Sequence, residues 1–405
     1  MRGWIVACAL ALCGAAAAGD WPGFLGPDGT GVSAETVDAW PAAPAELWRV
    51  ETGDSWAAPA IAGGRLVYAH RREGQERLEC VDAATGTPRW SYGHPVPYED
   101  AYGAGSGPRA TPLVSGGRVY ALGVTGQLVA VDLATGQPAW TRDLAADFHP
   151  AERDLFFGVG MSPVRAGDLI LIGIGGADGA GIVALDAATG KTAWARTPDG
   201  PSYSTPLVAS VAGTRLAFFL TRAGVVCLEP ASGAVRWSLP FRSRTVASVN
   251  AATPVLTAPG RLFVTSSYDV GGMLLDVEGP APRELWRSDV LSCHFATPIA
   301  VDGYLYGFDG RYDFPGSSLR CVEAATGKLV WKEESVTKGT LIRAGARFLI
   351  WAEGRLTLAE LTPKGYRALS TAALLPGPSW TPPALAQGRA YLRNEHTLVC
   401  VKLAP

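Results

Sequence analysis

The pattern of apolar and polar residues predicts many short strands, joined in pairs by tight turns. The stretch 128–140 shows the unit most clearly. Its first five residues, Leu128 to Asp132, are apolar or β-branched up to the closing aspartate, which favours a half-buried strand. Asp132 to Gly136 has turn chemistry, because glycine can adopt the positive φ that a tight turn requires. The chain then enters a second strand, which carries Trp140.

This unit recurs along the chain with fixed internal spacing. In each of five copies an acidic residue ends the first strand, a glycine closes the turn, and a tryptophan follows that glycine by four residues. The five tryptophans are Trp90, Trp140, Trp194, Trp237 and Trp331. Five such matches are very improbable by chance, so the repeat is the strongest signal in the sequence.

A second marker counts the units. A proline followed by an apolar strand recurs at Pro59, Pro112, Pro163, Pro206, Pro254, Pro298 and Pro382. The last interval is about twice the others, so a degenerate unit begins near Gly339 without its proline. Most units continue with a glycine turn and a further strand, so we expect eight units of four strands each.

Eight similar four-stranded units predict an all-β fold, an eight-bladed β-propeller over residues 45–405. A β-sandwich would not give eight similar units, and the two-residue period excludes a helical solenoid. Residues 46–50 match the end of a unit and residues 398–403 match the beginning of one. Pairing these two strands would close the ring and remove its open edges. Residues 19–44, rich in glycine and proline, are predicted to form an extended N-terminal arm.

One face of the ring is the expected place for binding. The longest connections, 91–109 and 142–160, both precede a proline marker and so project from the same face. Residues at corresponding places before the marker should surround one mouth of the central channel, and Asp309 could line the same channel. The candidates are Arg109, Phe157, Met161, Tyr203, Asn250, His294, Phe295, Asp309 and Trp380. They either seal the barrel or form a shallow pocket for a small ligand or peptide.

The first 18 residues resemble a secretory signal. Arg2 provides a thin positive region, residues 5–13 are apolar, and small residues precede Gly19. The apolar run is shorter than a membrane span of about 20 residues. We therefore expect a periplasmic or secreted protein without a transmembrane span. Lipidation at Cys13 is the alternative, although Leu12 is bulkier than the small residue that a lipidation site favours before its cysteine.

Composition narrows the possible functions. The formal net charge is -2 and no basic stripe is present, which argues against nucleic-acid binding. The histidines show no ligand-like pairing, so no metal site is predicted. Four cysteines, Cys80, Cys227, Cys321 and Cys400, occupy a slot that requires a small apolar side chain, and we interpret them as buried thiols. Cys293 lies outside that slot and is the one candidate for a reactive thiol.

The signature Asp-x-x-Thr/Ser-Gly-x-x-x-Trp resembles the pyrroloquinoline-quinone (PQQ) repeat, and the resemblance covers residues 46–403. It implies that the tryptophans dock between neighbouring blades. Trp286 fits with a longer turn after Asp276, and Tyr366 stands where the seventh unit would have tryptophan. Proteins with this repeat include PQQ-dependent dehydrogenases and non-catalytic propellers such as the assembly lipoprotein BamB. The docking set is Trp90, Trp140, Trp194, Trp237, Trp286 and Trp331.

The leading functional hypothesis is a non-catalytic monomer that binds an envelope protein, a peptide or a small ligand through one face, with no cofactor. The alternative is a PQQ-binding oxidoreductase, or its relic, with PQQ and Ca²⁺. The adjacent cysteine pair of such alcohol dehydrogenases is missing here, and no spacing selects calcium ligands among Glu152, Asp154, Asn250 and Asp309. An enzyme acting on extracellular polysaccharide would rest on the versatility of the fold alone.

Overall fold

The computed structural model describes residues 19–403 except 101, 104, 152–154, 156 and 247. The predicted signal (residues 1–18), its Cys13 and the calcium candidates Glu152 and Asp154 lie outside the described residues.

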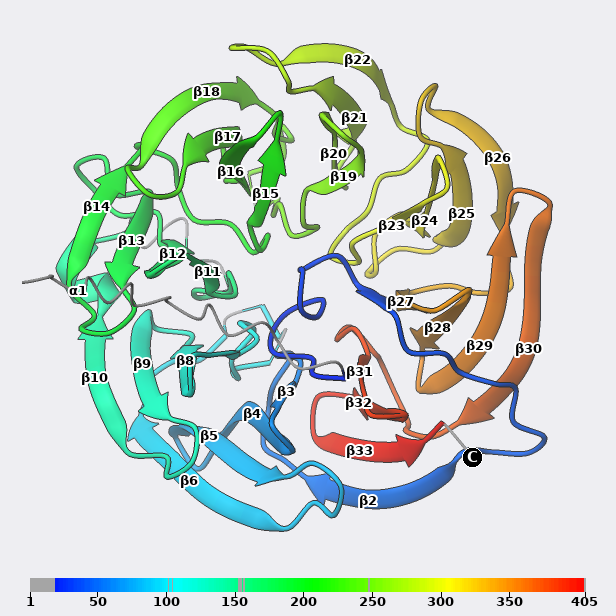
Figure 1. The fold of residues 1–405 in the computed structure, drawn as a ribbon, viewed down its shortest axis with the longest axis horizontal. Helices are drawn as coiled ribbons and strands as arrows, with labels where there is room; N and C mark the ends of the chain where they lie inside the picture. Colours follow the sequence, from blue (N-terminus) through cyan, green and yellow to red (C-terminus); the bar gives the residue numbers. More distant parts are fainter. Residues whose placement is uncertain are drawn as a thin grey trace, which may run out of the picture.

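Eight sheets form a closed ring around a central axis, as Figure 1 shows, so the predicted eight-bladed β-propeller is confirmed. Blade 1 contains β3 (Ala60–Ala62), β4 (Arg65–Arg72), β5 (Gln75–Asp82) and β6 (Pro88–Pro95), and blade 2 contains β7 (Leu113–Ser115), β8 (Arg118–Leu122), β9 (Gln127–Asp132) and β10 (Pro138–Asp143). Blade 3 contains β11 (Val164–Ala166), β12 (Leu169–Gly173), β13 (Ile182–Asp186) and β14 (Thr192–Arg196). Blade 4 contains β15 (Leu207–Val211), β16 (Thr214–Leu220), β17 (Gly224–Glu229) and β18 (Ala234–Pro240). A short helix, α1 (Leu144–Phe148), follows β10.

The second half of the ring repeats this arrangement, with the shortest strands nearest the axis. Blade 5 contains β19 (Val255–Ala258), β20 (Arg261–Ser266), β21 (Gly271–Asp276) and β22 (Arg283–Ser288), and blade 6 contains β23 (Ile299–Val301), β24 (Tyr304–Asp309), β25 (Ser318–Glu323) and β26 (Lys328–Glu333). Blade 7 contains β27 (Gly339–Ala344), β28 (Arg347–Ala352), β29 (Arg355–Thr362) and β30 (Gly365–Ala373), and β1 (Val32–Ser33) adds to its inner edge. Blade 8 contains β31 (Ala384–Ala386), β32 (Arg389–Arg393), β33 (Thr397–Lys402) and β2 (Ala45–Glu51).

The repeated turn is held by its aspartate. After β9, the Asp132 carboxylate accepts hydrogen bonds from the backbone nitrogens of Ala134 and Thr135 and from the Thr135 hydroxyl, at 2.9–3.0 Å. Gly136 closes the turn with a φ of +73°, in the left-handed region that favours glycine. The geometry of this turn therefore explains why both an acidic residue and a glycine recur in the repeat.

The tryptophan of one blade contacts the turn of the next. The Trp90 indole nitrogen donates to the Leu133 carbonyl at 2.9 Å, and a Cβ on Gly136 would lie 2.6 Å from the Trp90 ring. Glycine therefore serves both the turn and the close approach of the indole. Equivalent indole–carbonyl bonds join Trp48 to Ala83, Trp140 to Ala187, Trp194 to Pro230, Trp286 to Ala324, and Trp331 to Thr362. Trp237 is buried in an apolar cluster that spans blades 4 and 5.

The ring closes with strands from the two ends of the described chain. β2 pairs antiparallel with β33, with Trp48 opposite Cys400, and completes blade 8. The predicted pairing of residues 46–50 with the C-terminal strand is thus confirmed. This closure gives blade 8 four strands, as in blades 1 to 6.

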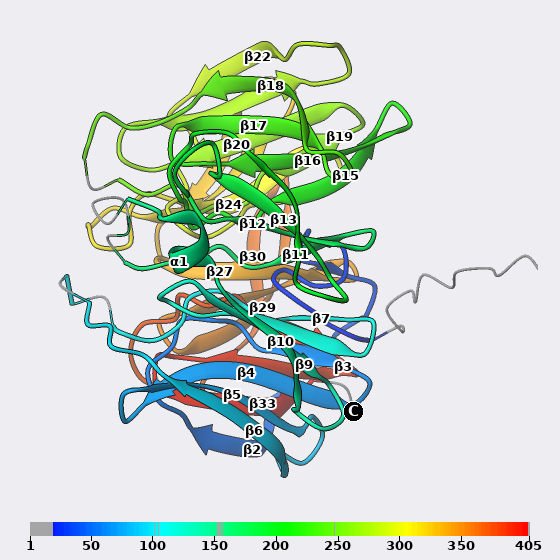
Figure 2. The same ribbon diagram turned by 90° about the vertical axis from the view of Figure 1, so that its left-hand side faces the viewer.

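The N-terminal arm lies on the face of the ring opposite the long connections, as Figure 2 shows. Trp21 is buried and pairs with Ile61 in blade 1. β1 then runs parallel to β27 in blade 7, and the Glu35 carboxylate accepts hydrogen bonds from the backbone of Gln387 and Gly388 in blade 8. The arm therefore ties together blades that are far apart in the sequence.

The cysteines lie inside the blades. Cys80, Cys227, Cys321 and Cys400 are buried and free, as predicted. Cys293 is also fully buried, and burial raises the pKa of its thiol, so it does not fit a reactive cysteine. Among the described residues, no helix is both long enough and apolar enough to cross a membrane.

Candidate functional site

A cavity of about 510 Å³ opens at the channel mouth on the face of the long connections. Each connection joins the outer strand of one blade to the inner strand of the next and places residues around this mouth. Six of the nine predicted channel residues line the cavity: Arg109, Phe157, Tyr203, His294, Phe295 and Trp380. On the opposite side, Phe24 of the N-terminal arm contributes to the lining.

Hydroxyl residues beside the proline markers fix the connections around the mouth. The backbone nitrogen of Ala58 donates to the Thr111 hydroxyl at 3.1 Å, and the backbone nitrogen of Thr111 donates to the Ser162 hydroxyl at 2.9 Å. Thr253 and Thr297 repeat this contact at 2.9 Å. Each such bond joins adjacent blades, so the Thr/Ser-Pro marker sets where the preceding side chain enters the mouth.

One wall of the cavity is a packed aromatic cluster. The rings of Trp56 and Trp380 stack with centroids 4.1 Å apart and planes inclined by 23°. Phe295 lies 5.6 Å and Tyr312 lies 4.9 Å from Trp380. Stacked and edge-to-face aromatic pairs stabilise such a surface beyond their apolar area, so this wall is a rigid apolar surface.

The opposite wall has a second aromatic group around Phe157. Tyr102 and Tyr203 lie 5.4 Å and 6.0 Å from its ring, and the Arg109 guanidinium lies 5.8 Å above it. The Tyr203 hydroxyl accepts a hydrogen bond from the Phe157 backbone at 2.9 Å and donates to the Gly158 carbonyl at 3.0 Å. Burial raises the pKa of Tyr203, so its phenol is neutral near pH 7.

His294 is a neutral, fully engaged side chain. Its Nδ1 accepts a hydrogen bond from the Tyr312 backbone at 3.3 Å, and its Nε2 lies 2.8 Å from the Tyr268 hydroxyl. Because Nδ1 is an acceptor, the neutral ring carries its proton on Nε2, which donates to Tyr268. Burial lowers the pKa of His294 to about 4. The histidine therefore positions its neighbours and has no spare nitrogen for proton transfer.

Two charged residues of the cavity, Arg311 and Asp313, were not among the candidates from the sequence. Arg311 lies between the rings of Tyr268 and Phe314, with its guanidinium 4.3 Å and 4.4 Å from their centroids, and forms a two-point ion pair with Asp313. These residues lie in hairpin loops between the second and third strands of blades 5 and 6. Such loops carry no repeat marker, so no sequence signal pointed to them.

Three predicted channel residues have side chains directed elsewhere. The Met161 sulfur accepts a hydrogen bond from the Gly173 backbone at 2.9 Å inside an apolar cluster. The Asn250 amide donates to the carbonyls of Thr221 and Phe241, at 2.8 Å and 3.2 Å. Asp309 pairs with Arg320 at 2.8 Å and accepts the Ser292 backbone N–H at 2.7 Å. Met161 and Asn250 lie before proline markers and Asp309 ends β24, but each side chain is held by its own neighbours and does not line the cavity.

The described residues do not fit a calcium–quinone pair. Such a pair needs a carboxylate and an amide oxygen that converge beside the bound ring. Among the described residues that line the cavity, Asp313 is the carboxylate, and both of its oxygens hold Arg311. Asn250 and Asp309 are directed away, as described above. The absence of a cofactor remains a prediction, and no catalytic step is derived through PQQ.

The fold is that of a PQQ-like β-propeller, and the cavity at its channel mouth is lined largely by aromatic side chains. The family described as outer membrane protein assembly factor BamB matches residues 34–176 and 103–333, which together span well over half of the chain, and the chain belongs to this family. A relative of that name from Moranella endobia is 23% identical over 236 residues, covering 55% of this chain and 56% of that protein. The chain thus spans about half the length of the curated relatives it matches.

Solved structures show the same fold at low sequence identity. BamB from Moraxella catarrhalis superposes with a TM-score of 0.62 at 16% identity, over 89% of this chain and 98% of that one. Quinohemoprotein alcohol dehydrogenase from Comamonas testosteroni gives 0.65 at 14% identity, over 97% and 82%. The fold is therefore shared by BamB and by a quinohemoprotein alcohol dehydrogenase, so the fold alone does not define a function.

Proposed function

We propose that this protein is a non-catalytic binding protein of the bacterial cell envelope that holds a partner protein on its connector face. By connector face we mean the mouth of the cavity with the loops that contain Tyr102, Val246 and Phe314. The family described as an outer membrane protein assembly factor supports the envelope location and a protein partner. The predicted export signal agrees with this location.

The observation that carries the proposal is an apolar rim around an aromatic cavity. Tyr102, Val246 and Phe314 are 60%, 72% and 52% exposed and lie on three different loops of the connector face. Exposed apolar side chains around a hollow mark an interaction site, and the cavity volume lies within the range of about 300–1,000 Å³ typical of ligand sites. A partner loop can rest on the rim and place an apolar side chain in the cavity.

The polar groups of the cavity support binding over catalysis. His294 uses both ring nitrogens, and Arg311 is neutralised by Asp313. The Tyr203 phenol is held by two backbone contacts. Groups that are fixed in this way provide shape and orientation, whereas a general base needs a free acceptor at the reacting atom.

The test uses the outer membrane protein assembly complex, purified from a strain that lacks its own BamB. We expect saturable binding of this protein to the complex, measured by interferometry. Val246→Asp and Phe314→Asp should weaken binding at least tenfold, because each places a charge on the apolar rim. The matched controls are Val235→Asp and Leu329→Asp, which are exposed on the outer strands β18 and β26.

The controls decide the outcome. Unchanged binding in the two rim variants, or equal weakening in the outer-strand variants, would refute the connector face as the interface. A lack of any binding to the complex would refute the proposed partner. Circular dichroism of each variant checks that the ring remains folded.

A further inference from the structure

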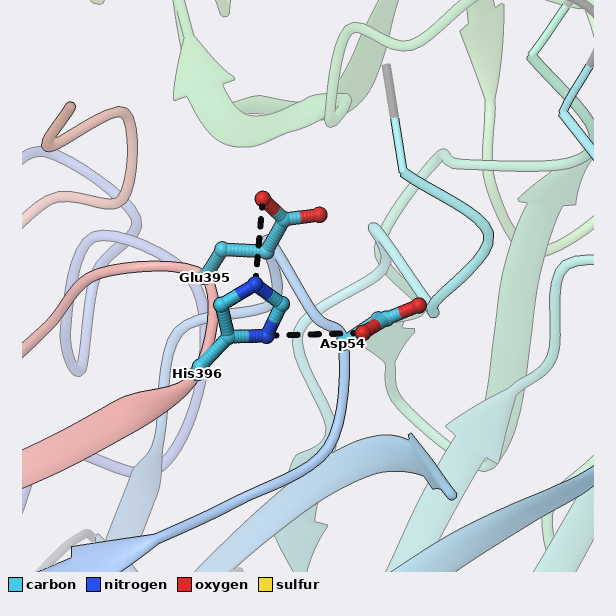
Figure 3. A group of neighbouring side chains, drawn as sticks. All are labelled: Asp54, Glu395 and His396. Carbon is cyan, nitrogen blue, oxygen red and sulfur yellow. Dashed lines mark ion pairs between the residues drawn. The ribbon is translucent and has the colours of Figure 1, made fainter. Parts of the chain in front are cut away.

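A second cluster of possible ligands lies at the junction where the ring closes, outside the aromatic cavity. Asp54 follows β2 in the connection to blade 1, and Glu395 and His396 lie in the hairpin between β32 and β33. One ligand atom from each of the three lies within 4.8 Å of the other two. Figure 3 shows the His396 ring between the two carboxylates.

The backbone holds these three residues firmly in place. The Thr52 backbone nitrogen donates to the His396 carbonyl, and the Ser55 backbone nitrogen donates to the Glu395 carbonyl at 3.1 Å. The Asn394 side chain accepts hydrogen bonds from the backbone nitrogens of His396 and Thr397. Ligands fixed by rigid backbone contacts lose little entropy when they bind an ion.

The three side chains converge, and His396 lies within ion-pairing distance of both carboxylates. The His396 Nδ1 lies 3.4 Å from Asp54 Oδ1, and its Nε2 lies 3.6 Å from Glu395 Oε2. Within the described part of the chain, no hydrogen bond joins these three side chains to one another or to other groups. Glu395 is partly buried, and a bound cation would stabilise its carboxylate there.

We propose that Asp54, Glu395 and His396 bind one divalent transition-metal ion, with Zn²⁺ as the probe. One imidazole nitrogen and two carboxylate oxygens are donors that suit Zn²⁺ better than Ca²⁺ or Mg²⁺, which prefer oxygen ligands alone. The exposed His396 ring rotates so that one nitrogen meets the ion, and water completes the coordination. Because the ligands come from both sides of the junction, the ion would link β2 to the last hairpin of the chain.

The experiment is a calorimetric titration of Zn²⁺ into the chelator-stripped protein. We expect one ion per chain, with affinity reduced about tenfold or more in Asp54→Asn, Glu395→Gln and His396→Gln. His149→Gln, which replaces an exposed histidine at the end of α1, is the matched control and should bind like the unaltered protein. A melting series in chelator confirms that all variants fold.

A second readout separates a specific site from surface adsorption. Zn²⁺ should raise the Tm of the unaltered protein and of His149→Gln, but not of His396→Gln, because an ion that binds only the closed ring stabilises it by mass action. Non-saturable binding, or binding that survives all three ligand substitutions, would overturn the proposal. Saturable binding of Ca²⁺ without Zn²⁺ would overturn the assignment to a transition metal.

Discussion

The two faces of the ring differ in how they are built. The face covered by the N-terminal arm carries the repeated turns, where the glycine and the neighbouring tryptophan make equivalent contacts in most blades. The connector face carries loops of unequal length that share only the hydroxyl–proline marker. Structural regularity and candidate binding chemistry are thus separated onto opposite ends of the same strands. Substitutions on the two faces should therefore affect different properties.

The largest expected loss of stability comes from a substitution on the face that the N-terminal arm covers. Trp90→Ala removes an indole that contacts the next blade and donates to Leu133. We expect a loss of about 3 kcal/mol in the free energy of unfolding, near the lower end for large-to-small aromatic substitutions because the ring is partly exposed. Denaturant unfolding measures this loss. Tyr102→Ala, on the connector rim, is the comparison and should change stability by less than about 0.5 kcal/mol.

The next largest loss of stability is expected at Gly136, the glycine that contacts the Trp90 indole. Gly136 and Gly117 have nearly equal φ values of +73° and +75°, but a Cβ on Gly136 would meet Trp90 whereas one on Gly117 would meet nothing within 4 Å. Gly117→Ala should cost about 1 kcal/mol from backbone strain alone. Gly136→Ala should cost clearly more in the same unfolding measurement. Equal costs would show that the indole contact is loose.

On the connector face, the expected signature is a pH dependence. Burial holds the pKa of folded His294 at about 4, below the value of about 6.5 in an unfolded chain. The unfolded chain therefore binds a proton that the folded chain excludes, and stability falls as the pH drops below 6.5, by about 2 kcal/mol between pH 7 and pH 5.

His294→Gln removes this group, so its Tm should fall less between pH 7 and pH 5 than that of the unaltered protein. His149→Gln, an exposed control, should retain the full decrease. Parallel melting curves for all three proteins would contradict a buried neutral imidazole.

The smallest effect is expected when PQQ is added to the protein. Because Asp313 is occupied by Arg311 and no amide oxygen of Asn250 is placed beside it, we expect no saturable binding of PQQ with or without Ca²⁺. Absorbance and calorimetric titrations measure this directly. Saturable binding at micromolar concentration would restore the oxidoreductase hypothesis and would place a cofactor site on the connector face.

The contrast between the faces also explains what could be predicted from sequence. Asp132, Gly136 and Trp140 interact within one turn or with the adjacent unit, so their spacing predicted the repeated unit. The proline markers then gave the number of blades, and the half-units at 46–50 and 398–403 gave the closure. Arg311 and Asp313 contribute to the cavity through a loop that no other unit repeats. Asp309 shows the opposite error, because the sequence does not reveal that Arg320, on the neighbouring strand, pairs with it.

Ring closure also sets an order of assembly. Blade 8 needs β2 from near the beginning of the chain and β31 to β33 from near its end. During synthesis, β2 therefore keeps an open edge until some 350 later residues have followed. A chain truncated before Thr397 would therefore leave that edge of β2 unpaired. The closing strand pair thus makes the completed ring depend on strands from both ends of the described chain.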